Sequence, residues 1–402
     1  MRLLIVYPYV PYPLNRGTYH RVYNLARELG RYHQVDLFCL DEGGDSSRAD
    51  AFSFARRVHF EPFAHPPWPR LFPERLLNSV PTTIQHWSSK SVAEALLKFA
   101  GEEKYDAVHF CDLVLWQYAS LLPRGRLRIM DRSRVDLLFQ DEELKHLDLS
   151  ATEHILRREN LWKLGRYESL VAKQLDLMVV CGPEDEVFLR SHVPEARRIK
   201  VLANGVDEAF FSMEKFPPTP DLEPTVLFCG AMDYSPNVDG LKWYFEKADA
   251  LLLQKIPNRR VLVVGKNPLP AVLALAARPG VTVTGEVPDV RPYYQKSWVQ
   301  MVPLRIGGGT RLKIVESLSL GTPVVSTTVG AQGLNLRHGE HLLLADTPSD
   351  FAGQLALIMQ DKARRARLAN EGRRQVLAHY TWQQLGRELS RDYENLLQEK
   401  SS

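Results

Sequence analysis

Three consecutive glycines separate an apolar run from a charged stretch in PLRIGGGTRLKIVESLSLGTPVVST, at 303–327. The preceding residues, VQMVPL, are apolar like a buried strand, and the following RLKIVESLSL has the period of a helix. Gly307, Gly308 and Gly309 therefore occupy a strand-to-helix turn, where no Cβ keeps a ligand from the backbone. Free N–H groups of the first helical turn and the helix dipole favour an anion, so the pattern predicts a phosphate site.

Charged side chains surround this turn. Arg305, Arg311 and Lys313 add positive charge, so the bound anion could be a diphosphate. Glu316 lies about one and a half turns into the helix, too far along to cap it. Its carboxylate could accept two ribose hydroxyls, or it could instead pair with Lys313 at the i,i+3 spacing.

Strand-like and helix-like runs alternate along the whole chain, which at 402 residues is long enough for two domains. The apolar runs lack clean alternation, as is typical of strands buried on both faces of a parallel sheet. We therefore expect two doubly wound, Rossmann-like α/β domains. The predicted strands are 2–7, 33–40, 106–110, 127–131, 177–182 and 200–205, then 225–230, 260–265, 281–285, 299–304, 323–327 and 341–345.

A proline-rich segment marks the expected domain boundary. KFPPTPDLEP has four prolines in ten residues, and a new strand follows it directly. The predicted domains are therefore 1–215 and 216–380, each Rossmann-like. The last stretch, 381–402, reads as an amphipathic helix that packs back on the first domain.

Composition narrows the functional classes. The chain has 51 Lys+Arg against 48 Asp+Glu, which gives no case for nucleic acid as a partner. It shows no apolar run of the roughly 18 residues that span a membrane, and no secretory signal. The four cysteines read as buried free thiols of a reducing compartment, so we expect a cytoplasmic protein. Without a C-x-x-C or D-x-D motif, no metal site is predicted.

Two segments could contact partners. HPPWPRLFPERLLNSVPTTIQHW, at 65–87, combines prolines, aromatic residues and arginines. It could rest on the surface of a membrane or grip an amphiphilic acceptor, or it could be an ordinary ordered loop. The basic run 362–374 is interrupted by apolar residues, which favours a solvated helix face over an anion-binding surface.

The order of several motifs resembles a known family. A glycine-containing loop follows the first strand, NGVD stands at 204–207, GAMDYSPNVDGL at 230–241, and GGGTRLKIVESLSLGTPVVST comes last. With this order, the chain resembles the retaining glycosyltransferases of family 4, which have the GT-B fold, and especially the branch from bacterial exopolysaccharide gene clusters. No G-x-G-x-x-G follows the first strand and no P-loop is present, which disfavours nicotinamide and P-loop enzymes.

This resemblance implies how the domains are used. The GT-B fold places a deep cleft between two Rossmann-like domains. The second domain would hold a nucleotide-diphosphate sugar, and the first would hold a glycan or lipid-linked glycan acceptor. No further cofactor is implied. Such acceptors would bring the protein to the inner face of the cell membrane, as a peripheral contact.

Donor-binding residues carry over one by one. Glu316 matches the second glutamate of the family's paired-glutamate motif, whereas the first falls at Gly308 and is missing. Gly17, with Thr18 beside it, matches the loop glycine near the donor phosphates, and Thr310 belongs to the glycine turn. The family's Arg and Lys after the first strand of the second domain are absent from AMDYSPN at 231–237. We infer that Arg305, Arg311 and Lys313 supply the charge instead.

First-domain residues carry over less directly. The family's active-site histidine would fall near Cys111, so His109 and Asp112 are the candidate catalytic residues there. His109 lies in a predicted strand, where it could equally be a packed core residue. Asp131 and Arg132, at the start of DRSRVD, follow the next strand and could contact the acceptor.

Together these residues predict glycosyl transfer with retention and without a metal ion. Arg305 and Lys313 would stabilise the negative charge that grows on the leaving diphosphate. A non-hydrolysing nucleotide-sugar epimerase of similar architecture is one alternative. A catalytically dead binding or scaffold protein is the other, suggested by the missing first glutamate.

Overall fold

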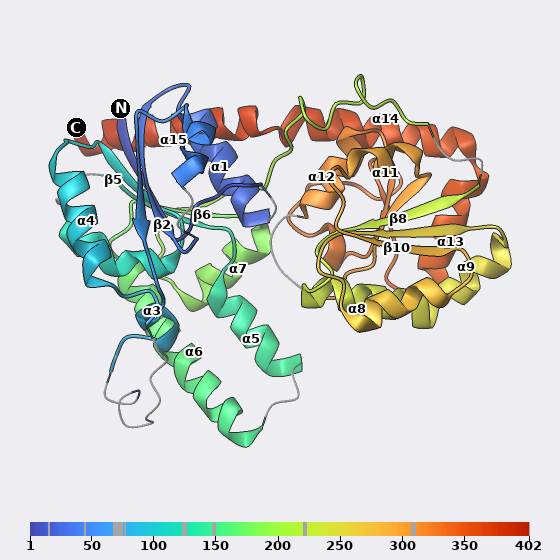
Figure 1. Ribbon diagram of the computed structural model, residues 1–402, viewed down its shortest axis with the longest axis horizontal. Coiled ribbons are helices and arrows are strands. Elements are labelled where there is room, and N and C mark those ends of the chain that lie inside the picture. The colour runs from blue at the N-terminus through green and yellow to red at the C-terminus, as the bar shows by residue number, and fades with distance from the viewer. Residues whose placement is uncertain are drawn as a thin grey trace. The chain divides into compact units, whose positions relative to one another are not determined.

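A computed structural model of the chain describes residues 1–14, 17–43, 46–66, 75, 78–122, 127–146, 150–219, 223–306 and 311–401. The chain folds as two units (Figure 1). Unit 1 is Met1–Leu202 together with Trp382–Ser402, and unit 2 is Ala203–Thr381. The boundary therefore lies before the proline-rich segment, because the residues that follow Leu202 pack within unit 2. Phe211, for example, is buried and its carbonyl accepts a hydrogen bond from Ser319 Oγ at 2.8 Å.

Unit 1 contains a seven-stranded sheet in the order β3-β2-β1-β4-β5-β6-β7. Its described strand pairs are all parallel. Short apolar runs buried on both faces produce these strands, as the sequence predicts. The strands are β1 (Arg2–Tyr7), β2 (Gln34–Asp41), β3 (Arg57–Pro62), β4 (Ala107–Phe110), β5 (Leu127–Arg132), β6 (Leu177–Val180) and β7 (Ile199–Val201).

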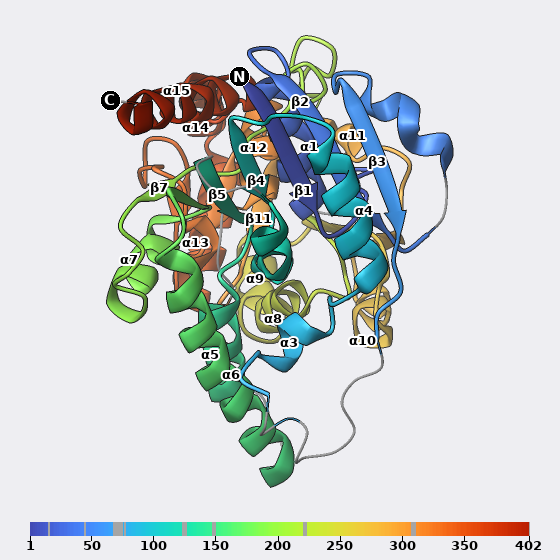
Figure 2. The same cartoon turned by 90° about the vertical axis from the view of Figure 1, so that its left-hand side faces the viewer.

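Helices cover both faces of this sheet (Figure 2). Alternate residues point to opposite faces, so Leu4 and Val108 enter a core with residues of α4, whereas Tyr7 and His109 contact α1 and α15. The helical elements are α1 (Gly17–Leu29), η1 (Ser46–Phe52), α3 (Thr82–Gln85), α4 (Lys90–Gly101), η2 (Leu113–Leu121), α5 (Asp136–His146), α6 (Ala151–Ala172), α7 (Pro183–His192) and α15 (Trp382–Ser401).

The last helix, α15, packs against α1 within unit 1. A Cβ atom added at Gly386 would lie 2.3 Å from Glu28 Cβ, so the two helices approach closely at this glycine. Ser390 Oγ lies 2.8 Å from His33 Nε2, and Tyr393 is fully buried. The C-terminal segment thus contributes to the core of unit 1 although unit 2 precedes it in the chain.

Unit 2 contains a six-stranded sheet in the order β10-β9-β8-β11-β12-β13, and its described strand pairs are also parallel. The strands are β8 (Thr225–Cys229), β9 (Arg260–Val264), β10 (Val281–Gly285), β11 (Val299–Val302), β12 (Val324–Ser326) and β13 (Leu343–Leu344). Both units are therefore doubly wound parallel α/β domains, and the predicted fold class is confirmed.

Two hydrophobic cores lie on the two faces of the second sheet. In Figure 1, α8 and α9 lie on one side of this sheet, and α11 and α12 lie on the other. The helical elements are α8 (Ser235–Trp243), the π-helical η3 (Tyr244–Ala248), α9 (Asp249–Lys255), α10 (Pro270–Leu273), η4 (Ala274–Ala277), α11 (Arg291–Lys296), α12 (Leu312–Ser319), η5 (Val329–Ala331), α13 (Pro348–Gln360) and α14 (Lys362–His379).

The basic run near the end of unit 2 forms α14, and several of its cations are already paired. Arg374 pairs with Glu371, Arg364 lies 3.4 Å from Asp361, and Arg373 lies 2.6 Å from Glu214. These pairs fit the expected solvated helix face. Among the helices in the described ranges, none is both long and apolar enough to cross a membrane.

Candidate active site

The order of strands in unit 2 reverses between β8 and β11, which are neighbours in the sheet. Loops leaving the carboxyl ends of two such strands run in opposite directions, and this opens a crevice in which doubly wound folds bind ligands. Here β8 ends at Cys229 and β11 at Val302, and Arg311 directly precedes α12. The predicted turn residues Gly307, Gly308, Gly309 and Thr310 lie outside the described residues.

Lys313 reaches from the first turn of α12 to the carboxyl end of β8. Its ammonium Nζ lies 2.8 Å from Asn237 Oδ1 and 4.3 Å from the centre of the Phe228 ring. Protein atoms surround this group, and the resulting desolvation lowers the pKa of Lys313 to about 7. The site therefore holds a cation that is destabilised in the absence of a bound anion.

Asn237, on α8, fixes the position of this ammonium. Its Nδ2 donates to the Ala231 carbonyl at 2.7 Å, which leaves Oδ1 pointing at Lys313. Gly230 makes room for the arrangement, because a Cβ there would lie 2.8 Å from Asn237 Nδ2 and 2.9 Å from Lys313 Nζ. Gly230 also has a φ of 155°, which other residues rarely adopt. The role of Asn237 was not predicted from the sequence, because its contact with Lys313 joins residues that are 76 positions apart.

Glu316 lies on the same helix, behind Lys313. Its Oε2 is 3.4 Å from the Tyr294 hydroxyl, and burial raises the pKa of its carboxyl to about 7. Within the part of the chain that the structure describes, Lys313 forms no ion pair with Glu316, because its ammonium is turned to Asn237 instead. The i,i+3 pairing that the sequence left open is therefore not formed, and the Glu316 carboxylate is available to accept hydroxyls.

The two arginines of the predicted site differ in their surroundings. Arg305 is half-exposed and makes a two-point ion pair with Asp239 on α8, with Nη2–Oδ1 at 2.5 Å and Nε–Oδ2 at 3.1 Å. Arg311 is buried at the start of α12. The structure thus brings Arg311, Lys313 and Glu316 together at the start of α12, whereas the charge of Arg305 is shared with Asp239.

Unit 1 has its own reversal of strand order, between β1 and β4. Gly17 and Thr18 open α1 on the chain that leaves β1, and Asp112 follows β4 directly. Asp112 has a φ of 138° and a ψ of 151°, a region that is almost restricted to glycine. Burial, reinforced by the neighbouring Asp136, raises the pKa of Asp112 to about 6. Backbone strain of this kind is concentrated at functional sites, which singles out Asp112.

Arg132 lies near Asp112, at the end of β5. It is buried, pairs with Glu168 and lies 3.7 Å from Asp136. Its Nε and Nη2 atoms have no hydrogen-bond partner among the described residues. Arg132 and the Asp112 carboxyl thus form a polar cluster at the ends of β4 and β5, in which Arg132 is the buried member.

His109 and Asp131 are placed differently from the prediction. His109 is 2% exposed, its Nδ1 lies 2.9 Å from the Tyr393 hydroxyl on α15, and burial lowers its pKa to about 4. Asp131 accepts two hydrogen bonds from the buried Arg21, from Nε at 2.9 Å and from Nη2 at 2.8 Å. Because both side chains are used inside the core of unit 1, we no longer assign His109 a catalytic role or Asp131 an acceptor contact.

Comparison with known proteins defines the class of the second unit. Residues 223–361 match the family described as glycosyl transferases group 1, so most of unit 2 is similar to the domain of that family. The match spans β8 to α13 and includes Asn237, Lys313 and Glu316. No group of three or more His, Cys, Asp or Glu residues in the described ranges is placed to hold a metal ion.

Two curated relatives cover parts of the chain. An uncharacterized 44.6 kDa protein in the cps region of Klebsiella pneumoniae is 27% identical over 182 residues, which are 43% of this chain and 43% of that protein. The D-inositol 3-phosphate glycosyltransferase of Rhodococcus opacus is 28% identical over 239 residues, which are 54% of this chain and 52% of that enzyme. The chain thus matches about half the length of each relative.

Solved glycosyltransferase structures share the fold over almost the whole chain. Sucrose-phosphate synthase from Thermosynechococcus elongatus superposes with a TM-score of 0.70 at 20% identity, over 99% of this chain and 100% of that one. Anabaena HepE in complex with UDP-glucose superposes with a TM-score of 0.65 at 13% identity, over 98% and 99% of the two chains. The chain therefore shares with these structures a fold of two Rossmann-like domains, which is the GT-B fold of these structural neighbours.

Proposed function

We propose that this protein transfers a sugar, with retention of configuration, from a nucleotide-diphosphate sugar to a hydroxyl of a glycan or lipid-linked glycan. The proposal places the protein in family 4 of the retaining glycosyltransferases. The observation that carries the proposal is the Lys313 ammonium, which Asn237 holds at the strand-order reversal of a glycosyl transferase group 1 domain. An uncompensated cation in that crevice favours a diphosphate.

The chemistry follows from the movement of charge. In the transfer, the bond between the anomeric carbon and the leaving phosphate oxygen breaks, and a bond from the acceptor oxygen to that carbon forms. Negative charge grows on the diphosphate, and the hydroxyl proton of the acceptor passes to it. Lys313 and Arg311 stabilise the developing charge, so no metal ion is needed. The approach of the diphosphate itself raises the pKa of Lys313 and keeps it protonated.

Glu316 orients the donor in this proposal. Its carboxylate accepts the two ribose hydroxyls of the nucleotide, and Tyr294 holds it from the other side at 3.4 Å. The glycine turn would place backbone N–H groups against the phosphates or the sugar. HepE was crystallised with UDP-glucose, which supports a nucleotide-diphosphate sugar as the donor here.

The acceptor belongs to unit 1 in this proposal. Asp112, which lies beside the buried Arg132, offers a carboxyl whose pKa is about 6, a group suited to sugar hydroxyls. The Klebsiella relative from a cps region supports a role in polysaccharide synthesis. We place the reaction in the cytoplasm, at the inner face of the membrane, where lipid-linked glycans are presented.

An assay of nucleotide release tests the proposal against its two alternatives. The protein is incubated with a panel of nucleotide-sugars, and released nucleotide diphosphate and altered sugars are measured. A transferase releases nucleotide diphosphate slowly even without acceptor, whereas an epimerase interconverts the sugars and a scaffold does neither. The presence of Lys313 and Glu316 together in α12 argues against the scaffold, and the assay decides between the transferase and the epimerase.

A further inference from the structure

Helix α6 carries two apolar stripes rather than one. Its inner stripe, which includes Leu164 and Val171, is buried in the core of unit 1. On the outside, Ile155 is 58% exposed, Trp162 60% and Leu170 59%. A helix that only packs on a core needs the first stripe alone. The second stripe therefore calls for a partner outside the unit.

Basic residues alternate with the outer apolar residues. Arg158, Arg166 and Lys173 are exposed and follow Ile155, Trp162 and Leu170 at spacings of three or four residues. Residues at these spacings share one helix face, so the stripe extends for ~27 Å along α6. We name these six residues the α6 face.

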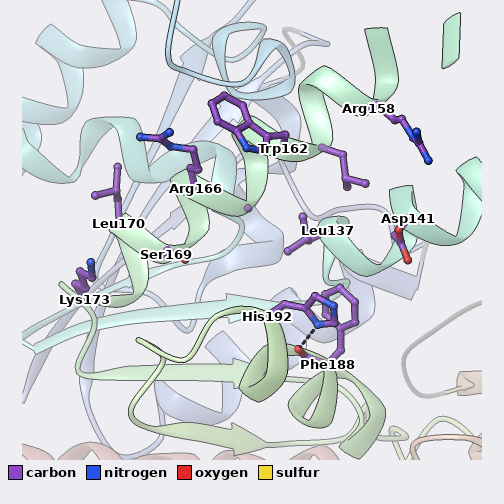
Figure 3. Close-up of a pocket in the computed structure, with 12 residues that line it drawn as sticks. Leu137, Asp141, Arg158, Trp162, Arg166, Ser169, Leu170, Lys173, Phe188 and His192 are labelled. Atoms are coloured by element: carbon purple, nitrogen blue, oxygen red, sulfur yellow. Dashed lines mark hydrogen bonds between the residues drawn. The ribbon is translucent and has the colours of Figure 1, made fainter. Parts of the chain in front are cut away.

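All residues of the α6 face except Ile155 also line a groove (Figure 3). It has a volume of about 650 Å³ and is lined by residues of α5, α6 and α7. Leu137, Leu161 and Phe188 supply apolar lining, and Trp162 and Arg166 stand together on the α6 side in Figure 3. The groove is wide enough for a chain-like apolar group and has cations near its opening.

The charge of this surface is largely uncompensated. Within the described residues, neither Arg158 nor Arg166 has an ion-pair partner, and the Arg166 guanidinium lies 4.9 Å from the centre of the Trp162 ring. Lys173 lies 3.6 Å from Glu195, and Asp141 is the one acidic residue that lines the groove in those ranges. By contrast, Arg364 and Arg374 on α14 both have carboxylate partners.

Two described residues of the segment at 65–87, which the sequence singled out, contact the same helix. Arg75 Nη2 lies 3.0 Å from Glu159 Oε2, and Thr83 N donates to Asn160 Oδ1 at 3.4 Å. Residues 67–74 and 76–77 lie outside the described residues. The contacts show that Arg75 and Thr83 themselves lie against α6.

We propose that the α6 face docks unit 1 on an anionic lipid bilayer, with the groove receiving the apolar part of a lipid. Tryptophan prefers the boundary between headgroups and acyl chains, and arginine can keep its stem in the apolar layer while its charge reaches the phosphates. A second copy of the chain would bring the same cations against these, so charge disfavours a dimer. The inference rests on unit 1 alone and does not depend on the transfer reaction.

Co-sedimentation of the full chain with lipid vesicles tests this proposal. The protein should bind vesicles that contain phosphatidylglycerol, bind phosphatidylcholine vesicles much more weakly, and dissociate as salt is added. Arg158→Glu with Arg166→Glu should weaken binding by about 20-fold or more. The matched control is Arg364→Glu with Arg374→Glu, which makes the same change of charge on α14 and should leave binding close to that of the unmodified chain.

The contribution of apolar side chains to vesicle binding is tested by one variant on α6 and one control variant elsewhere. Leu170→Ala should weaken vesicle binding several-fold, whereas Leu273→Ala, at a leucine 50% exposed on α10, should not. Melting curves confirm that each variant is folded. Nucleotide release without acceptor should be unchanged in the α6 variants, so loss of vesicle binding is distinguished from loss of the proposed reaction.

Two outcomes would overturn the proposal. One is a failure to bind anionic vesicles at low salt, or equal losses in the α6 and α14 variants. The other is a concentration-dependent dimer, seen by analytical ultracentrifugation and abolished by Trp162→Ala, which would assign the face to a second copy of the chain.

Discussion

At the scale of single residues, the proposed sugar transfer depends on a lysine whose position is set by an asparagine. Lys313 and Asn237 are 76 residues apart in the sequence, and their contact at 2.8 Å joins the start of α12 to α8. No local motif could reveal this pair, because neither residue lies in the other's segment. The residue types and spacing around the glycines did single out Lys313 and Glu316, which the structure places on α12.

A double-mutant cycle tests this pair. Lys313→Ala should lower turnover by about 10²-fold, because it removes a group that stabilises the leaving charge. Asn237→Ala should lower turnover by about tenfold, since the ammonium loses its fixed position. The double variant should be no worse than Lys313→Ala alone. Asn258→Ala, at an exposed position in the same unit, is the control, and fully additive losses would contradict the assignment.

The pH dependence of nucleotide binding tests Lys313 and Glu316 together. Both groups have a pKa of about 7, lowered for the lysine and raised for the glutamate. Binding needs protonated Lys313, which is favoured below that pH, and ionised Glu316, which is favoured above it. Affinity for the nucleotide diphosphate should therefore peak near pH 7.

Variants separate the two limbs of that profile. Glu316→Gln should lower affinity by about 1.5–3 kcal/mol and remove the acid limb, whereas Lys313→Ala should remove the alkaline limb. Titration calorimetry between pH 5.5 and 8.5 (about one and a half units either side of the maximum) measures both. A profile that keeps both limbs in either variant would show that other groups titrate.

Backbone strain at Asp112 gives a third residue-scale prediction. Asp112→Gly relieves a conformation that costs a non-glycine residue about 1–3 kcal/mol, although it also removes the bond from Val114 N to the carboxylate. We expect a melting temperature at or above that of the unmodified protein, together with a loss of turnover. Asp112→Asn retains the strain and should not be stabilised. A clear fall in melting temperature for the glycine variant would argue against stored strain.

At the scale of elements, the sequence predicted most strands and the final helix closely. The predicted strand 281–285 and β10 coincide, and the predicted helix at 381–402 is α15, Trp382–Ser401. Apolar runs and helical periodicity depend on neighbouring residues alone, so the elements that they predict are found in the folded structure. The face to which His109 points is not local, because it depends on which helix covers that side of the sheet.

The packing of α15 on α1 gives an element-scale prediction. Gly386→Ala would bring a methyl group within 2.3 Å of Glu28 Cβ, so it should destabilise the protein by about 1–3 kcal/mol. Gly353→Ala on α13 is the matched control, since a Cβ there meets no atom within 4 Å. It should be neutral or stabilising by up to about 1 kcal/mol. Denaturant unfolding measures both, and equal stabilities would contradict the close approach of the two helices.

At the scale of the whole molecule, the doubly wound architecture was predictable and the boundary between units was not. Alternating runs specify two parallel sheets, whereas the prolines at 215–224 suggested a boundary that lies earlier, after Leu202. Val206 pairs with Thr381 and Phe211 is buried in unit 2, and such long-range packing leaves little mark on composition.

The central claim is that the crevice of unit 2 binds and cleaves a nucleotide-diphosphate sugar, and nucleotide release from a panel of such sugars tests it most directly. The unmodified chain should release the diphosphate of at least one nucleotide-sugar without acceptor and with chelator present. Release should fall by about 10²-fold in Lys313→Ala. Interconversion of sugars without net release, or release that Lys313→Ala leaves unchanged, would contradict the account.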